Sequence, residues 1–141
     1  MQQPEQRIAD FLRKHHVLTL ATCTEGIPWC ASVFYVYMPA ENLLIFTSEY
    51  PTRHIQEAAQ NDKIAGTVAL ETKQVGLVRG VQFQGRIFEP TDDLRQKAKR
   101  AFLASFPYAI LKLAPFWAIE LYVIKFTDNR LGFGKKLHWT I

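Results

Sequence analysis

Apolar and polar residues alternate along several stretches of the chain, with the two-residue period of strands that bury one face. Glu25 and Gly26 separate two of these stretches and favour a hairpin turn. Because the stretches are joined by short connections, they indicate antiparallel pairing rather than β-α-β units. The predicted strands cover residues 17–24, 28–38, 43–48, 63–71, 75–90, 116–127 and 131–141.

Three other stretches, residues 4–16, 52–60 and 91–106, place apolar residues at the spacing of amphipathic helices. The third has the clearest limits, because Thr91 suits the N-cap position and Pro107 ends the pattern. Strands outnumber helices, so the predicted fold class is mainly β. We expect a small antiparallel barrel with peripheral helices.

The stretch from Trp29 to Met38 is apolar on both of its faces. Trp29, Ala31, Val33, Tyr35 and Tyr37 share one face, and Cys30, Ser32, Phe34, Val36 and Met38 share the other. Both faces are therefore expected to be covered. The barrel interior would cover one face, and a ligand or a partner subunit would cover the other.

The size and composition bound the class of protein. With 141 residues, 48% of them hydrophobic, the chain is expected to form one domain over residues 1–141. No secretory apolar region follows Met1, and Lys112, Pro115 and Glu120 interrupt the most apolar segment. A cytoplasmic location without membrane insertion is expected. The formal charge of +4 favours anionic partners in general.

Several kinds of chemistry have no matching pattern in the sequence. The nucleophile elbow of hydrolases, the P-loop and the dinucleotide-binding glycine fingerprint are all absent. Cys23 and Cys30 form neither a zinc pattern nor a redox pair, and we expect both to be reduced and packed. No metal site is predicted, and no catalytic acid or base can be assigned.

One corner between a predicted strand and a predicted helix gathers polar groups suited to an anion. Its residues are Thr47, Ser48, Thr52, Arg53 and His54. A helix N-terminus leaves backbone N–H groups unpaired and carries partial positive charge, so the corner could hold a phosphate. The alternative is an ordinary capped helix whose first-turn Arg53 and His54 are solvated.

The order of these elements, followed by the run from Arg79 to Gly85, resembles the pyridoxamine 5′-phosphate oxidase-like FMN-binding split barrels. The resemblance covers most of residues 5–127. Residues 124–136 look more narrowly like the YhbP branch, whose function is unassigned. The resemblance implies an antiparallel split β-barrel and a homodimer with FMN sites at the subunit interface.

The resemblance also assigns roles to residues. It implies that the FMN phosphate is held by Thr47, Ser48, Thr52, Arg53 and His54, that the ring is lined by the segment with Ser32, Val33 and Phe34, and that Gln82 approaches the flavin. Two positions depart from the oxidases. His54 stands where they usually have lysine, and Gly80 stands where they have a flavin-contacting glutamine. Pyridoxamine phosphate oxidation is therefore not expected.

Three functional hypotheses follow. The leading one is an FMN-binding protein and, if it is an enzyme, an FMN-dependent oxidoreductase of unknown substrate. The second is a non-catalytic module that binds haem, deazaflavin or another anionic ligand in the same groove. The third is a nucleic-acid-binding barrel that uses Arg95, Lys99 and Arg100; it is disfavoured because the aromatic residues lie in apolar strands rather than among these basic residues.

Overall fold

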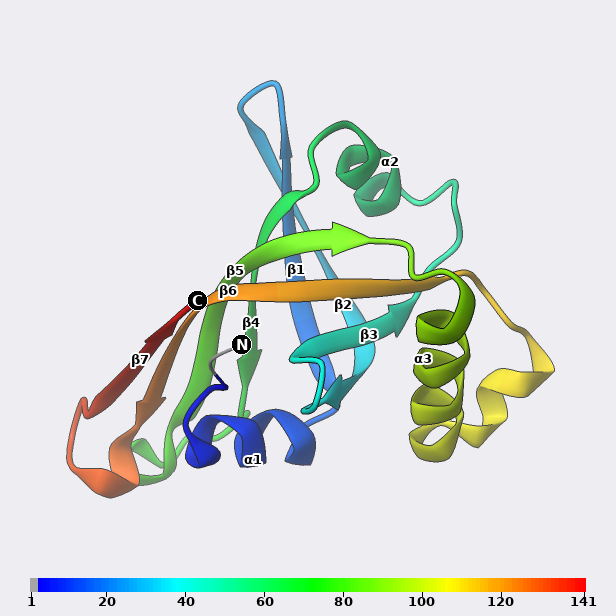
Figure 1. Cartoon of the computed structure of the whole chain (residues 1–141). Helices are drawn as coiled ribbons and strands as arrows, with labels where there is room; N and C mark the ends of the chain where they lie inside the picture. The colour runs from blue at the N-terminus through cyan, green and yellow to red at the C-terminus, as the bar shows by residue number, and fades with distance from the viewer. Residues whose placement is uncertain (1–2) are drawn as a thin grey trace.

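The structure is a computed structural model that describes residues 3–141. Helices α1, α2 and α3 lie outside a sheet of seven strands (Figure 1). The helices are α1 (Gln6–Lys14), α2 (Arg53–Gln60) and α3 (Asp92–Ser105). The strands are β1 (Val17–Thr24), β2 (Ile27–Met38), β3 (Leu43–Thr47), β4 (Lys63–Ala69), β5 (Arg79–Phe88), β6 (Phe116–Asp128) and β7 (Lys136–Thr140). Short 3-10 segments are η1 (Val75–Leu77), η2 (Pro107–Leu111) and η3 (Asn129–Leu131).

The sheet closes on itself through β6. Its order is β3-β2-β1-β4-β5-β6-β7, and β3 also pairs with β6, so that β1 to β6 form a ring of antiparallel strands. The 13 residues of β6 serve two partners on the same side, because the first part pairs with β3 and the last part pairs with β7. The predicted fold class, an antiparallel split β-barrel with peripheral helices, is confirmed.

The barrel has one core inside and a second core under α3. Tyr35 points inward and donates a hydrogen bond from its hydroxyl to Leu12 O of α1 (2.7 Å), so α1 closes one end of the barrel. Val36, on the opposite face of β2, belongs to the second core together with Phe102 of α3. The alternation predicted for β2 is therefore real. From Tyr35 to Met38 both faces are buried, but the earlier residues of β2 are more exposed, with Phe34 62% exposed.

The structure differs from the predicted boundaries at the starts of β5 and β7. The predicted strand at 75–90 begins only at Arg79, and the predicted strand at 131–141 begins at Lys136. Asn129 accounts for both differences, because its backbone N donates to Val78 O (3.0 Å) and its side chain donates to Val75 O (2.8 Å). These bonds tie η1 to η3 in place of a continued ladder.

The position of the hairpin turn decides whether the two cysteines face each other. Thr24 pairs with Ile27, so the turn falls on Glu25 and Gly26, and Cys23 lies opposite Pro28 rather than opposite Cys30. Both cysteines are free. The expectation that both are packed is wrong for Cys30, which is exposed because it lies on the uncovered part of β2.

Over residues 3–141, no helix combines the length and the apolar character that a membrane crossing requires.

Candidate functional site

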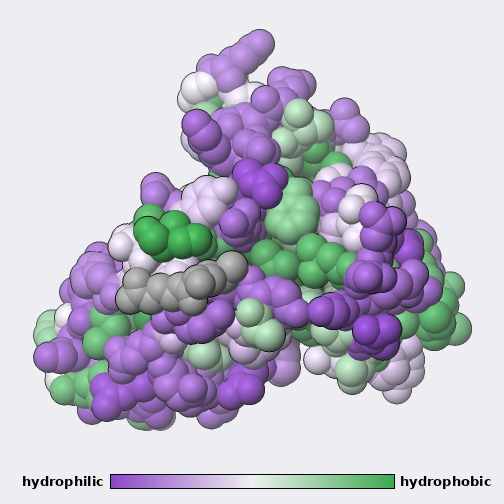
Figure 2. Space-filling model, viewed as in Figure 1, coloured by the Kyte–Doolittle hydropathy of each residue, from purple (hydrophilic) through white to green (hydrophobic). Residues whose placement is uncertain are grey.

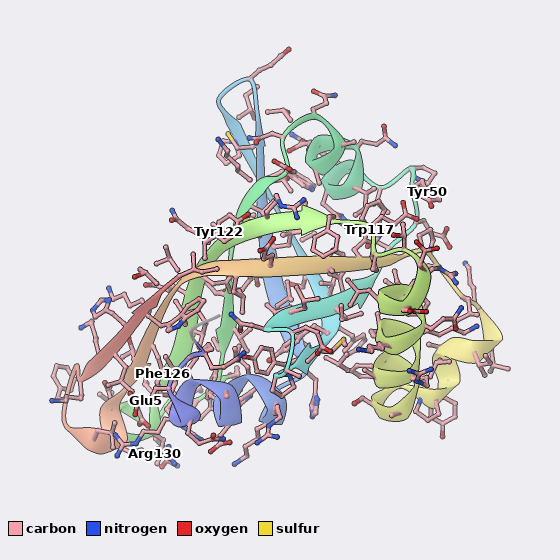
Figure 3. All side chains as sticks on the ribbon, viewed as in Figure 1. Glu5, Tyr50, Trp117, Tyr122, Phe126 and Arg130 are labelled. Carbon is pink, nitrogen blue, oxygen red and sulfur yellow. The ribbon has the colours of Figure 1, made fainter. Side chains whose placement is uncertain are left out.

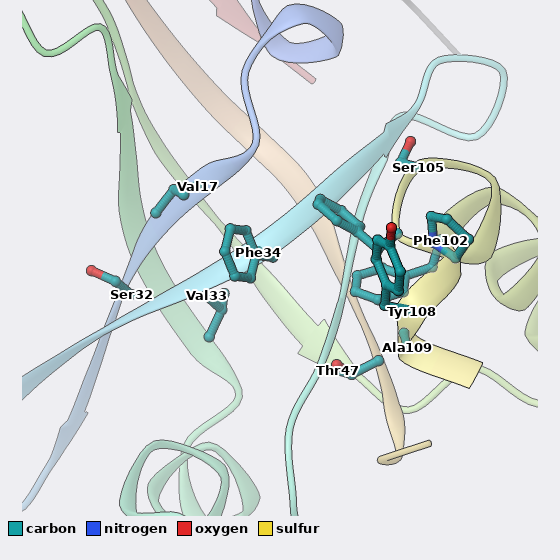
Figure 4. Close-up of a pocket in the computed structure, with 11 residues that line it drawn as sticks. Val17, Ser32, Val33, Phe34, Thr47, Phe102, Ser105, Tyr108 and Ala109 are labelled. Atoms are coloured by element: carbon teal, nitrogen blue, oxygen red, sulfur yellow. The ribbon is translucent and has the colours of Figure 1, made fainter. Parts of the chain in front are cut away.

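A cavity of about 870 Å³ lies where β3 separates from β2. The two strands pair only between residues 35–38 of β2 and residues 43–46 of β3. Before Tyr35, β2 pairs with no other strand on that side in the part of the chain that the structure describes. Its residues 32–34 thus present a free strand edge to the cavity, with backbone groups available for hydrogen bonds. The lining residues are Val17, Ser32, Val33, Phe34, Thr47, Phe102, Ser105, Phe106, Pro107, Tyr108 and Ala109 (Figure 4).

Aromatic side chains form the walls of the cavity. The rings of Phe34 and Phe106 lie 5.4 Å apart between centroids, and Phe106 also contacts Phe102 at 4.9 Å. Tyr108, in η2, is 84% exposed. Apolar side chains also gather on the surface over the segment that follows α3, at the right edge of Figure 2. A slot with these walls suits a flat aromatic ligand.

The polar corner predicted from the sequence begins at the rim of this cavity. Thr47 ends β3 and lines the cavity, and Ser48 follows it. The Ser48 backbone is held from two directions, since its N–H donates to Pro115 O (3.1 Å) and its carbonyl accepts from Trp117 Nε1 (3.0 Å). Trp117 also meets the ring of Tyr50 edge to face at 5.8 Å (Figure 3). These contacts hold the segment that leads from the cavity toward α2 in one direction.

The N-terminus of α2 has unused hydrogen-bond donors. Thr52 is its N-cap residue, but its hydroxyl donates to Glu49 O (2.9 Å) instead of accepting from the helix. Within residues 3–141 no side chain caps this helix. The backbone N–H groups of its first turn are therefore available, together with the partial positive charge of the helix end.

Arg53 is partly engaged within its own chain. Its Nε donates to Glu57 Oε2 (2.7 Å), and its guanidinium lies over the ring of Trp29 at 4.0 Å. Glu57 also accepts from Thr22 (2.9 Å), and the hydrogen bond from Arg53 is the main cause that lowers the Glu57 pKa. The terminal nitrogens of Arg53 make no hydrogen bond to any described residue, so they remain available to an anion.

Trp29 and Glu57 did not figure among the predicted site residues. Glu57 could have been found from the sequence, because Arg53 and Glu57 are four residues apart on one helix. Trp29 gave no such signal, because it comes from a different element and its contact depends on how α2 packs against β2.

His54 is bound to Ser48 rather than facing solvent. Its Nε2 lies 2.6 Å from Ser48 Oγ, and partial burial lowers the His54 pKa below its ordinary value of 6.5. The imidazole is therefore neutral at pH 7. The positive charge of the corner comes from Arg53 and the helix end, and His54 supplies hydrogen bonding.

The lowered His54 pKa predicts a loss of stability in acid. A histidine that binds its proton more weakly when folded contributes stability above the unfolded pKa, near 6.5, and loses it as the pH falls. We expect the free energy of unfolding to fall from pH 7 to pH 5, and His54→Gln to reduce that slope by up to about 1.4 kcal/mol per pH unit. Urea unfolding at several pH values measures it, with the exposed His138→Gln as the control. Equal slopes in His54→Gln and wild type would contradict the prediction.

Gln82 lies apart from the other predicted site residues. Ser32 pairs with Thr19, Thr19 with Thr67, and Thr67 with Gln82, so Gln82 is three strands away from Ser32 on the outer face of the sheet. The structure places Ser32, Val33, Phe34 and Thr47 around one cavity. Ser48, Thr52, Arg53 and His54 form the adjoining corner.

The ring of strands with a cavity at the point where β3 leaves β2 defines a split-barrel protein. Residues 4–120 match the profile of the family described as pyridoxamine 5′-phosphate oxidase. A UPF0306 protein of Klebsiella pneumoniae is 46% identical over 132 residues, which cover 94% of this chain and 90% of that protein. The chain therefore belongs to the pyridoxamine 5′-phosphate oxidase family.

Solved structures with low sequence identity share this fold. A haem-binding protein from Mycobacterium smegmatis has a TM-score of 0.81 at 18% identity, covering 99% of this chain but only 60% of that one. An FAD-binding protein from Mesorhizobium loti has a TM-score of 0.69 at 18% identity, covering 89% of this chain and 95% of that one. At these identities the likeness concerns the fold alone.

Proposed function

We propose that the protein binds FMN, with the isoalloxazine ring in the cavity beside β2 and the phosphate at the N-terminus of α2. The observation that carries this proposal is that the two features are neighbours. Thr47 lines the aromatic-walled cavity, and the adjacent Ser48 lies 2.6 Å from His54 in the first turn of α2, where the helix end has free donors. A flat ring and a dianionic phosphate on one ligand match these two environments.

Different residues would bind the ring and the phosphate of such a ligand. Phe34 offers an aromatic face to the ring, and the free edge of β2 offers backbone groups to its polar rim. Thr47 and the α2 backbone donate to the phosphate, and the terminal nitrogens of Arg53 supply the charge. Bound FMN would supply electron-transfer chemistry, so an activity of this protein would be that of an FMN-dependent oxidoreductase.

A second copy of the chain would complete the site. Phe34 is 62% exposed and Trp29 is 41% exposed, so the first half of β2 keeps apolar surface that its own chain does not cover. Gln82 lies on the outer face of the sheet, away from the cavity of its own chain. We propose a homodimer in which this outer face packs on a partner and Gln82 approaches the partner's flavin.

Haem is the second candidate, because a protein of this fold is described as haem-binding. Haem iron takes an axial ligand such as histidine, cysteine, methionine or tyrosine. Among the described residues that line the cavity, Tyr108 alone belongs to that set. FMN needs no such ligand, and its phosphate uses the α2 corner, so the donor set favours FMN.

Titration of the purified protein with FMN, riboflavin and haemin tests the proposal. The fluorescence of FMN should be quenched saturably by the protein. FMN should bind more tightly than riboflavin, because only FMN carries the phosphate. Light scattering of the FMN-bound protein should show a dimer. Equal affinity for FMN and riboflavin would show that the α2 corner does not bind the phosphate. Saturable haemin binding without FMN binding would replace FMN with haem. Anaerobic bleaching of bound FMN by NAD(P)H would then separate an enzyme from a carrier.

A further inference from the structure

A second cavity lies on another side of the barrel, between α1 and the ends of β5 and β6. It has a volume of about 240 Å³ and shares no lining residue with the cavity beside β2. Phe11 and Phe126 form its floor, and both are buried. Phe126 and Arg130 lie together at this corner of the molecule in Figure 3, and the surface below α1 is mostly hydrophilic in Figure 2. The charged lining residues are Arg7, Asp10, Lys14, Arg79, Asp128 and Arg130.

The cavity has more positive than negative charge. Four basic and two acidic side chains line it, a formal excess of two positive charges. Both carboxylates are already compensated, because Asp128 is bound by Arg130 through Nε (3.1 Å) and Nη2 (2.9 Å), and Asp10 accepts from Arg13 (3.0 Å). Arg13 is not one of the lining residues, so its charge adds to the surroundings of the cavity.

Arg79 is the lining arginine without a direct ion pair. Asp128 lies within its electrostatic reach, but Arg130 already binds that carboxylate. The Arg79 Nε is buried and has no hydrogen-bond partner within residues 3–141, and the Arg79 side chain makes no ion pair with any described carboxylate. The guanidinium lies 5.9 Å from the centre of the Phe11 ring. The side chain is partly buried, so its free N–H donors would gain from an anion bound in the cavity. Among the described residues, Arg7 forms an ion pair only with Glu5, at 3.8 Å, and Lys14 is exposed.

We propose that this cavity is a binding site for a phosphoryl group, either inorganic phosphate or the phosphate of a larger molecule, with Arg79 as its anchor. Two excess charges match a dianion, and a guanidinium fork matches phosphate oxygens in pairs. Arg7 and Lys14 close the site from α1. The site is separate from the proposed FMN groove and does not depend on it.

His15 provides a local probe of occupancy. Its ring packs on Phe11 at 4.1 Å, and its pKa is lowered by burial first and then by the charge of Arg79. A phosphate bound to Arg79 offsets that charge. The His15 pKa, followed by NMR of the imidazole protons, should therefore rise when phosphate is added.

Isothermal titration with inorganic phosphate, against chloride at equal ionic strength, tests the site. Arg79→Gln should weaken binding at least tenfold, and exposed Lys14→Gln should weaken it several-fold. Arg100→Gln, which removes an exposed cation of α3, is the matched control and should bind like wild type. Arg79→Gln should keep the wild-type fold in chloride by circular dichroism, because it breaks no hydrogen bond or ion pair to any described residue. Glycerol phosphate as a second ligand distinguishes a free anion from an esterified one.

Phosphate could also bind at the α2 corner, so Arg53→Gln is titrated in parallel. The proposal would be overturned, and the anion assigned to α2, if Arg53→Gln lost phosphate binding while Arg79→Gln bound phosphate like wild type. Absence of saturable binding in wild type, an equal loss in Arg100→Gln, or a His15 pKa that phosphate leaves unchanged would also overturn it. FMN affinity should be the same in Arg79→Gln and wild type. The phosphate site and the FMN site are therefore tested independently.

Discussion

Replacing Gly85 with alanine is expected to lower the free energy of unfolding by about 3 kcal/mol. Gly85 lies at a bulge between β5 and β6, where Gln84 pairs with Val123 but Gly85 pairs with Leu121. A methyl group at this position would meet the Glu120 carbonyl oxygen at 2.2 Å. Because the obstacle is backbone in the middle of the ring of strands, it can move only if the β5–β6 ladder opens.

Gly76→Ala is the matched control for this substitution. A methyl group at Gly76, in η1, would meet no atom within 4 Å. Its expected effect lies between none and a stabilisation of about 1 kcal/mol, because alanine restricts the unfolded chain. Urea unfolding followed by circular dichroism measures both variants. Similar stabilities for the two alanine variants would show that the β5–β6 ladder is more compliant than the bulge geometry implies.

Replacing Arg53 with glutamine is expected to weaken FMN binding by about 2 kcal/mol, or roughly thirtyfold. The proposed phosphate position has one permanent cation, since His54 is neutral at pH 7 and the remaining donors are backbone or hydroxyl groups. Riboflavin lacks the phosphate, so its affinity should be the same for wild type and Arg53→Gln. Fluorescence titration with both ligands measures the difference.

Glu57→Gln completes this test. The Glu57 carboxylate occupies Arg53 Nε at 2.7 Å and competes with an incoming phosphate for the same cation. Removing its charge is expected to maintain or increase FMN affinity, whereas Arg53→Gln decreases it. A loss of riboflavin affinity in Arg53→Gln would show that Arg53 acts through Trp29 and the packing of β2 instead of through the phosphate.

Much of the candidate site was predictable because it is local. Thr47, Ser48, Thr52, Arg53 and His54 lie within eight consecutive residues, so a strand followed by a helix is enough to bring them near one corner. The engagement of Arg53 with Trp29 was not predictable, because β2 and α2 meet only through the tertiary packing. Gln82 shows the same limit, since its distance from Ser32 depends on the strand order.

The cavity around Arg79 could not be predicted from a sequence pattern. Arg79 was visible as the start of a strand motif, but the other groups around it come from α1 and from the end of β6. That Arg79 has no direct ion pair within residues 3–141 depends on how α1, β5 and β6 pack together. The boundary errors at 75–78 and 131–135 have the same origin, because the hydrogen bonds of Asn129 link two loops that are about fifty residues apart in the sequence.

By itself, the sequence determined the mainly β class, the alternation of the strands, the family and the polar corner at α2, because each depends on the identity and spacing of neighbouring residues. Only the tertiary structure decided where β3 leaves β2 to pair with β6. That divergence opens a free edge at residues 32–34 and sets it opposite Thr47 and the aromatic end of α3. The physical reason is closure, since a ring of strands brings into contact side chains that no local pattern connects.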